Sequence, residues 1–292
     1  MTYRGRFAPS PTGPLHFGSL VSALGSWLRA RACRGVWIVR MEDLDPPREV
    51  PGAAADILET LAAFGMPSDE PVLYQSSRSD AYGAAFEALR AAGRIFPCWC
   101  SRSDLEADAN IHRACRAPAA QDRAPAWRLR APDLVIEFDD LLLGPQRQNL
   151  RGEVGDFVVR RVEGWYAYQL AVVVDDAAQG VTEIVRGADL LDSTPRQIFL
   201  QRLLGLPTPG YVHLPLVLDA DGRKLSKHDK ARPIDRADPL PALRASLRFL
   251  GLDEQRGAAN VPQLLQASLR DFDLARIKKN AAPAADRVRD AS

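Results

Sequence analysis

The spacing of apolar residues predicts that strands and helices alternate in the first part of the chain. Residues 3–8 are predicted to form a short strand that ends in a run rich in proline and glycine. Residues 18–32 carry apolar side chains at helical spacing, and Gly35 is expected to end this helix. Residues 36–39 form a second buried strand, followed by the polar residues 40–43. Such a unit places polar side chains at the carboxyl ends of its strands, where open α/β sheets bind ligands.

The rest of the chain continues this alternation with one interruption. Helical spacing predicts further helices near 52–64, 79–92, 194–204, 240–250 and 261–271. Apolar runs predict further strands at 134–138, 156–162, 168–174 and 181–185. The periodicity disappears around the cysteines that follow residue 97. We therefore expect an α/β fold: a Rossmann-like parallel-sheet catalytic domain in two halves (1–95 and 130–235), a small cysteine-containing insertion (96–129) and a short, mostly helical C-terminal domain (236–292).

Composition narrows the class of protein. The 292 residues carry a net charge of +1, which excludes a globally basic nucleic-acid binder but not a local basic face. Residues 236–292 hold ten basic against seven acidic side chains, a weak indication of such a face. No apolar run approaches the roughly 20 residues of a membrane span, and the prolines that follow Met1 do not resemble a signal peptide. With only four cysteines, we expect a cytoplasmic protein without a disulfide scaffold.

Two segments far apart in the sequence carry candidate phosphate chemistry. Free backbone N–H groups at the start of the helix near Gly18, beside His16, suit a phosphate group. A P-loop is excluded, because Ser19 stands where its lysine would be. Lysine is rare in this chain, yet Lys224, Lys227 and Lys230 fall within seven residues. A flexible ammonium group can follow charge that develops on a phosphate, although such clusters are usually solvated loops.

These segments together resemble a known family. Two of them resemble the paired signature motifs of class I aminoacyl-tRNA synthetases, and three more resemble the glutamyl subgroup: His16–Ser19 and Lys224–His228, then Arg6–Gly13, Arg40–Pro46 and Val185–Leu190. The resemblance covers about residues 3–235 in the expected order. The chain has no room for the large anticodon-binding domains of a glutamyl-tRNA synthetase. In its motifs and its short chain length it is similar to the glutamyl-Q tRNA(Asp) synthetase branch of this family.

The resemblance implies an activity and its partners. Members of that branch activate L-glutamate with ATP, to glutamyl-adenylate and without tRNA, and attach it to queuosine in the anticodon of tRNA(Asp). We therefore expect a ligase that takes ATP with Mg²⁺, L-glutamate and a queuosine-containing anticodon stem-loop, acts as a monomer and contacts no membrane. No enzyme nucleophile is needed, because the substrate carboxylate attacks the α-phosphorus while the protein orients it and stabilises charge.

The resemblance also assigns site residues. The glutamate pocket is expected to contain Arg6, Ala8, Ser10, Glu42, Tyr168 and Arg186. The charges of these side chains agree with a glutamate pocket. Each of the two arginines can hold a carboxylate in a bidentate manner, and Glu42 can bind the ammonium group. ATP is expected at His16, Gly18, Ser19 and Lys227, with His16, Lys224 and Lys227 as the catalytic residues.

Several alternatives stay open. The chain could instead charge the 3′ end of a tRNA as a truncated glutamyl-tRNA synthetase, bind tRNA as a non-catalytic paralogue, or transfer a nucleotide to another acid. Any single arginine could form an ordinary surface ion pair. Asp43, Asp45 and Arg48 fit a structural ion network as well as a site, and Asp175 and Asp176 could be the polar end of a strand.

The insertion holds a candidate metal site. Cys98, Cys100 and Cys115 lie within 18 residues and could supply three ligands to a tetrahedral zinc ion. Related enzymes often add a tyrosine a few residues before the last cysteine, but Ile111 stands four before Cys115 and His112 is the natural substitute. The alternative is a set of reduced cysteines without a metal. Cys33 lies on the predicted first helix and is expected to be a buried apolar residue.

Overall fold

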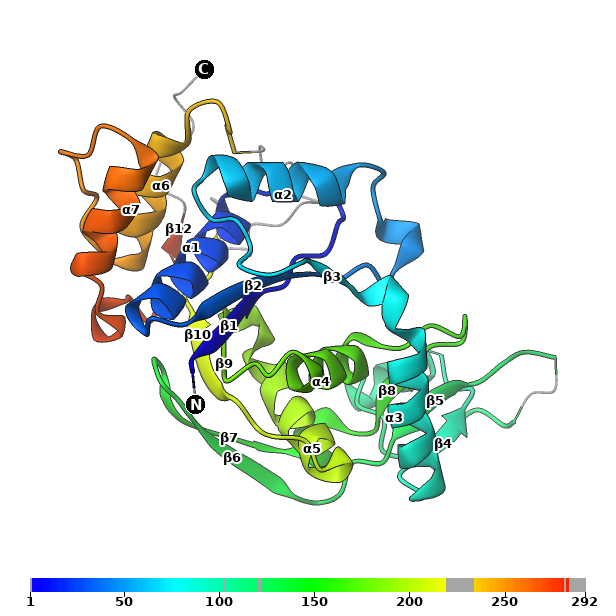
Figure 1. The fold of residues 1–292 in the computed structure, drawn as a ribbon. Helices are drawn as coiled ribbons and strands as arrows, with labels where there is room; N and C mark the ends of the chain where they lie inside the picture. Colours follow the sequence, from blue (N-terminus) through cyan, green and yellow to red (C-terminus); the bar gives the residue numbers. More distant parts are fainter. Residues whose placement is uncertain (1, 102, 120–121, 219–233, 281, 284–292) are drawn as a thin grey trace.

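The computed structural model describes residues 2–101, 103–119, 122–218, 234–280 and 282–283 (Figure 1). The strands are β1 (Arg4–Phe7), β2 (Val36–Met41), β3 (Leu73–Tyr74), β4 (Ile95–Cys98), β5 (Ala126–Leu129), β6 (Val135–Asp140), β7 (Gly144–Asn149), β8 (Phe157–Arg160), β9 (Glu183–Gly187), β10 (Gly210–Leu214), β11 (Val217–Leu218) and β12 (Ala282–Pro283). The α-helices are α1 (Phe17–Ala32), α2 (Ala53–Ala63), α3 (Ser79–Ala91), α4 (Tyr168–Ala178), α5 (Thr194–Leu204), α6 (Pro239–Leu250) and α7 (Val261–Arg270). Within these described ranges, no helix is long and apolar enough to cross a bilayer.

The central sheet consists of two parallel halves that meet at β1 and β9. One half has the order β1-β2-β3, and the other pairs β6, β10 and β9 in parallel, with β7 antiparallel at its edge. Backbone bonds join the halves, since Thr182 N donates to Arg4 O at 2.9 Å. From this junction the chain runs outward in opposite directions, through α1 to β2 and through α5 to β10. The expected Rossmann-like parallel sheet is confirmed, and its junction is the switch point at which such sheets bind ligands.

Helix α1 is built by an apolar stripe that fits one face of this sheet. Leu20, Leu24 and Leu28 recur at four-residue spacing and are fully buried. The helix ends at Ala32, and Arg34 adopts the left-handed conformation with φ of 51°. Gly35 is needed for a different reason than ending the helix: a Cβ there would lie 2.4 Å from the Tyr3 carbonyl oxygen. The glycine therefore lets β2 start tightly against β1.

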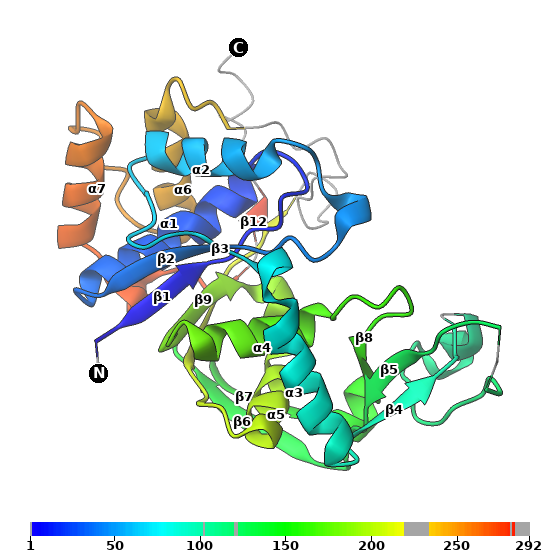
Figure 2. The same cartoon turned by 45° about the vertical axis from the view of Figure 1, so that its right-hand side comes forward.

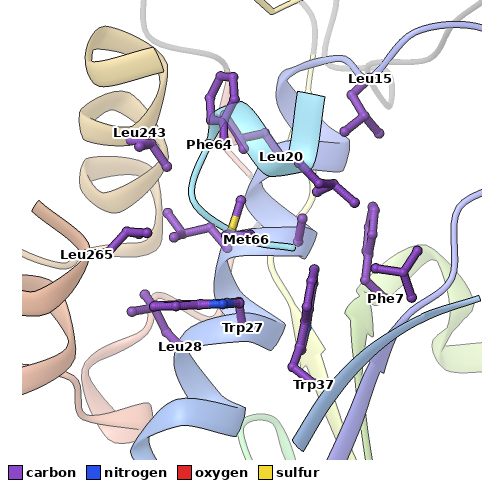
Figure 3. Packing of buried hydrophobic residues seen from close by; sticks show 14 of the residues in the cluster. Phe7, Leu15, Leu20, Trp27, Leu28, Trp37, Phe64, Met66, Leu243 and Leu265 are labelled. Atoms are coloured by element: carbon purple, nitrogen blue, oxygen red, sulfur yellow. The ribbon is translucent and has the colours of Figure 1, made fainter. Parts of the chain in front are cut away.

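The C-terminal helices share a hydrophobic core with α1. Leu243 of α6 and Leu265 of α7 belong to the same buried cluster as Trp27 and Leu28 of α1, and Figure 3 shows these side chains in that core. On general transfer energies, each such buried leucine contributes roughly 1.5–3 kcal/mol relative to an exposed one. The predicted helices at 240–250 and 261–271 are confirmed within one residue at each end. Their apolar faces fix them against α1, the helix that connects β1 to β2.

A second core lies on the opposite side of the sheet, where α3, α4 and α5 pack together (Figure 1). The predicted helix 194–204 is confirmed as α5, with Gly205 in the left-handed conformation at its end. The predicted strand 168–174 is wrong, because this segment belongs to helix α4. Its apolar run carries no period that separates a buried strand from a buried helix, and packing between α3, α5 and the sheet decides in favour of helix.

The insertion extends from a small antiparallel sheet of β4, β5 and β8, which is separate from the central sheet (Figure 2). The cysteine-containing segment connects β4 to β5. Strands predicted at 134–138 and 156–162 are confirmed as β6 and β8. β7 was not predicted, because its sequence Gly-Pro-Gln-Arg-Gln-Asn is polar on both faces, and it forms only as a hairpin partner of β6.

Candidate active site and metal centre

A cleft of about 430 Å³ opens at the carboxyl ends of β1 and β9. It is lined by nine of the residues that the sequence singled out: Arg6, Ala8, Ser10, His16, Gly18, Ser19, Glu42, Tyr168 and Arg186. These residues come from segments up to 180 positions apart, and the meeting of β1, α1, β2, α4 and β9 brings them together. Lys224 and Lys227 lie outside the described residues. The residues predicted for glutamate and those predicted for ATP therefore line one cleft, with the lysine motif left aside.

One buried carboxylate organises the floor of this cleft. Asp176 of α4 accepts a hydrogen bond from Arg6 Nε at 3.1 Å and another from Arg40 Nη1 at 2.7 Å. All three side chains are buried, and Arg40 is completely inaccessible. Burial opposes ionisation of Asp176, but Arg40 and Arg6 outweigh it and hold the pKa of this carboxyl below its usual value. Asp176 thus stays charged and fixes two guanidinium groups at the junction of β1 and β2.

Glu42 extends this network toward the cleft. Arg40 Nη2 donates to Glu42 Oε1 at 3.3 Å, and the Glu42 backbone N–H donates to Pro9 O at 2.9 Å. The second bond ties the end of β2 to the loop that follows β1. Burial raises the pKa of Glu42, and the positive charges of Arg40 and Arg6 act in the opposite direction. An arriving cation would favour the charged carboxylate and would be held by it.

Arg186 is held quite differently, because none of its hydrogen-bond partners among the described residues is a carboxylate. It is the penultimate residue of β9 and is only 5% exposed. Its donors contact five groups that carry no charge when the imidazole is neutral: His213 Nε2 at 3.1 Å, Tyr168 Oη at 3.3 Å, Gln197 Oε1 at 2.8 Å, Leu190 O at 3.3 Å and Thr194 Oγ1 at 2.7 Å. The two longest bonds go to Tyr168 and Leu190, which both line the cleft. The guanidinium therefore presents an uncompensated positive charge on the side where a ligand would enter.

Behind Arg186 lies a buried pair of His213 and Asp140. His213 Nδ1 and Asp140 Oδ2 are 2.7 Å apart, and both side chains are inaccessible. Burial lowers the pKa of His213, the bond to Asp140 acts against this shift, and the charge of Arg186 lowers the pKa further. Since Arg186 Nε can only donate, His213 Nε2 carries no proton and the imidazole is neutral. Burial opposes ionisation of Asp140, but bonds from His213 and the Leu143 amide outweigh it and lower its pKa. No sequence motif marks this pair, since a lone histidine in a strand is typical of a satisfied core residue.

The start of α1 faces the same cleft. His16 is the N-cap residue, and its Nδ1 accepts from Ser19 N at 3.4 Å while its Nε2 lies 3.1 Å from Ser19 Oγ. The first turn of α1 contains no acidic side chain. A Cβ on Gly18 would lie 3.2 Å from the His16 ring, so this position favours glycine. The positive end of the helix dipole is therefore available to an anion in the cleft.

The insertion brings four potential metal ligands together. Ligand atoms of Cys98, Cys100, His112 and Cys115 all lie within 4.8 Å of one another, which matches the expected set. His112 Nε2 lies 3.3 Å from Cys98 Sγ, and its Nδ1 lies 3.0 Å from Asp156 Oδ2. Asp156 of the β8 segment was not predicted, and it orients the ring as carboxylates orient metal-bound histidines. A set of three thiols and one imidazole in this arrangement fits tetrahedral zinc.

Two other predicted features have structural explanations. Asp45 accepts from Arg48 at 2.5 Å and from Arg161 at 3.2 Å, while Asp43 accepts from Ser76. The turn after β2 is thus an ion network, although Arg48 also lines the cleft. Asp175 and Asp176 are not a polar strand end, because both are buried in α4. Asp175 accepts from Gln75, Arg78 and Tyr82.

Comparisons with known proteins agree with this geometry. The family model of the catalytic domain of class I tRNA synthetases for glutamate and glutamine (E and Q) matches residues 2–252. A glutamyl-Q tRNA(Asp) synthetase of Burkholderia cenocepacia is 60% identical over 263 residues, which cover 86% of this chain and 88% of that protein. One from Xanthomonas campestris is 55% identical over 284 residues, covering 97% and 95%. A glutamate tRNA ligase of Elizabethkingia meningosepticum, crystallised with its amino acid, superposes with a TM-score of 0.80 at 25% identity, covering 98% of this chain and 68% of that one.

Removing the charge of Asp176 should destabilise the fold strongly. Asp176→Asn leaves two buried guanidinium groups without their shared anion, so we expect a loss of about 3–5 kcal/mol in unfolding free energy, measured by urea denaturation. Glu87→Gln makes the same chemical change in the exposed Glu87–Arg90 pair and should cost less than about 1 kcal/mol. Equal effects of the two substitutions would contradict the assigned role of Asp176.

Proposed function

The chain belongs to the glutamyl-Q tRNA(Asp) synthetase family of the class I tRNA synthetases, and on this premise we propose that it activates L-glutamate with ATP and transfers it to queuosine in the anticodon of tRNA(Asp). As a member of this family the chain is a ligase. The observation that carries the proposal is the pair Arg6 and Arg186, which line one cleft together with Glu42. We further propose that the adenylate forms without tRNA, in the cytoplasm, on a monomer.

The charges of the cleft suit glutamate. Its lining holds three arginines, Arg6, Arg48 and Arg186, against two carboxylates, Glu42 and Asp189, a net charge of three minus two, or +1. Glutamate has two carboxylates and one ammonium group, a net charge of −1. We propose that Arg6 and Arg186 each bind one carboxylate and that Glu42 binds the ammonium group, because these groups are complementary in sign and number.

Tyr168 completes the proposed amino-acid pocket. Its hydroxyl lies 3.3 Å from Arg186 Nη1, so an arriving carboxylate would be within reach of both groups. Ala8 and Ser10 line the same wall next to Arg6. Glutamine lacks the second negative charge, and aspartate is one methylene too short to reach both arginines. The pocket should therefore reject both.

The reaction needs orientation and charge stabilisation. A carboxylate oxygen of glutamate attacks the α-phosphorus of ATP, the bond from that phosphorus to the bridging oxygen breaks, and pyrophosphate leaves. His16, Gly18 and Ser19 at the start of α1 are placed to hold the phosphates. From the sequence motif we assign Lys224 and Lys227 to the charge that develops in the transition state. Mg²⁺ bound with ATP would neutralise phosphate charge.

We propose a structural zinc ion in the insertion, held by Cys98, Cys100, Cys115 and His112. The four ligand atoms already lie close together, and Asp156 holds the histidine from behind. The surrounding apolar cluster is small, since it consists of Cys98, Cys100 and Leu105 with two partly buried neighbours. A metal would therefore provide much of the free energy that orders this segment.

Glutamate activation should be measurable as ATP–pyrophosphate exchange without tRNA. Glutamate should support exchange, and glutamine and aspartate should not. Arg186→Ala should lower kcat/KM for glutamate by roughly 10- to 150-fold, the value of one charged hydrogen bond, while the KM for ATP stays near wild type. Arg90→Ala, in an exposed ion pair of α3, is the matched control and should match wild type. Exchange with glutamine as fast as with glutamate would overturn the two-carboxylate pocket.

Zinc analysis tests the metal centre. Protein purified without chelator should contain about one zinc per chain, and Cys98→Ser/Cys115→Ser should contain none. Cys33→Ser removes a thiol outside the cluster and should keep the metal. Asp156→Asn should weaken zinc binding by about 10- to 100-fold, because the histidine loses its orienting partner. Full zinc content in the double serine variant would refute this ligand set. Full zinc content in His112→Ala would exclude only His112 as a ligand.

The acceptor can be identified with short RNAs. An isolated tRNA(Asp) anticodon stem-loop that carries queuosine should accept radiolabelled glutamate, whereas the same stem-loop with guanosine should not, because the attacking hydroxyl belongs to queuosine. Intact tRNA should remain a substrate after periodate treatment of its 3′ ribose, provided that queuosine is protected. Glutamate found on the 3′-terminal adenosine would instead establish a truncated glutamate tRNA ligase, the activity named for the superposed structure.

A further inference from the structure

We propose that His213 and Asp140 are positioning residues for amino-acid binding: Asp140 holds His213 in the tautomer that carries its proton on Nδ1, and His213 in turn fixes the guanidinium plane of Arg186. The inference rests on the proposed function of Arg186 as a carboxylate ligand. Neither His213 nor Asp140 lines the cleft, so both would act through Arg186. The pair is distinct from the residues assigned to glutamate and ATP above.

The geometry of the sheet places these groups in a line. His213 is the direct neighbour of Arg186 across β10 and β9, and β10 also pairs with β6 at Asp140. Arg186 Nε lies 3.1 Å from His213 Nε2, and His213 Nδ1 lies 2.7 Å from Asp140 Oδ2. His213 is fully buried, so water cannot supply alternative partners. The alignment of three adjacent strands therefore produces the chain Asp140–His213–Arg186.

Hydrogen-bond chemistry fixes the tautomer. An arginine Nε always carries a proton and can only donate, so His213 Nε2 must accept. The single proton of the neutral ring then lies on Nδ1 and is donated to Asp140. Thr194 is compatible with this assignment, because its hydroxyl accepts from Arg186 Nη2 at 2.7 Å and can donate its own proton to Leu190 O at 3.5 Å. A proton on Nε2 would face the Arg186 proton directly.

Backbone hydrogen bonds fix the orientation of the Asp140 carboxylate. Its Oδ1 accepts from the backbone amides of Leu142 at 3.0 Å and Leu143 at 2.8 Å, so only Oδ2 faces the imidazole. The Tyr211 ring stacks on His213 with an interplanar angle of 8°, and the Arg186 guanidinium lies 5.7 Å from the centre of the same ring. The backbone amides and the aromatic ring together set the plane in which Arg186 is held.

This arrangement explains how Arg186 can be rigid and still carry an available charge. A direct carboxylate partner would fix the guanidinium but would also neutralise it. A neutral imidazole fixes Nε without cancelling the charge, and the anion of Asp140 is kept one ring further away. Such outer contacts preserve the geometry of a binding group and so lower the cost of ordering it when the ligand arrives.

Asp140→Asn gives the sharpest test. The amide oxygen should stay on the Leu142 and Leu143 amides, so its NH₂ group must face His213 Nδ1. That group can only donate, which forces the imidazole proton onto Nε2, against Arg186. We expect the KM for glutamate in pyrophosphate exchange to rise at least about tenfold, with the KM for ATP within about twofold of wild type. Imidazole ¹⁵N spectra without any ligand should show the Nδ1–H tautomer in wild type and Nε2–H in the variant.

A second pair of variants covers the case in which Asp140→Asn does not fold. In His213→Gln the side-chain oxygen can still accept near the Nε2 position, whereas in His213→Asn the amide reaches only toward Asp140. Glutamate affinity should therefore be better preserved in His213→Gln than in His213→Asn. Ser246→Ala alters a buried polar residue of α6 that bonds the Ala242 carbonyl and contacts none of these groups, and it should keep the wild-type KM for glutamate.

Three results would overturn the proposal: an Nε2–H tautomer in wild type, an unchanged KM for glutamate in a folded Asp140→Asn variant, or equal losses of affinity for glutamate and ATP, which indicate general damage. Failure of the proposed function is recognised separately. If wild-type protein supports no exchange with glutamate, the proposed function is refuted. The tautomer of His213 is measured without glutamate, so its result does not depend on that function.

Discussion

The cleft depends on one buried carboxylate, Asp176, which lies between Arg6 and Arg40 where the two halves of the sheet meet. Asp176 compensates the charge of two guanidinium groups that are almost completely buried, and α4 carries this anion. The same helix supplies Tyr168 at its first turn and Asp175, which is bonded to Gln75, Arg78 and Tyr82. The placement of α4 on the sheet therefore decides the positions of both the cleft floor and the segment that follows β3.

The two cleft arginines of the sheet junction are held by opposite means. Arg6 is paired with a carboxylate on the Nε and Nη2 side of its fork, so part of its charge is already compensated. Arg186 is surrounded by neutral groups and keeps its charge for a ligand. A site for an amino acid with two carboxylates needs this balance, because a pocket of unpaired cations would not stay folded and a fully paired one would not bind. Burial without neutralisation is achieved at Arg186 only because His213 is neutral.

Sequence patterns predicted much of this architecture. Local signals were sufficient for α1, α5, α6 and α7, because apolar side chains recur in them at helical spacing, and glycines end α5 and α6. The ligand set of the insertion was also predictable, because Cys98, Cys100, His112 and Cys115 lie close in sequence. The apolar run over residues 168–174 predicts a strand, and one interpretation of Asp175 and Asp176 makes them its polar end. No local pattern reveals that a continuous apolar run is enclosed by helices, or that a carboxylate within it meets arginines 136 and 170 residues away. The contact of His213 with Arg186 likewise depends on strand order, which only the folded sheet defines.

The central claim is that Arg6 and Arg186, brought together by the junction of β1 and β9, each take one carboxylate of the same glutamate molecule. The most direct test is a crystal structure of the chain grown with L-glutamate. It should show one glutamate in the cleft, with one carboxylate within about 3.2 Å of each guanidinium and the ammonium group on Glu42. Glutamate bound with both carboxylates on one arginine, or bound outside this cleft, would contradict the account.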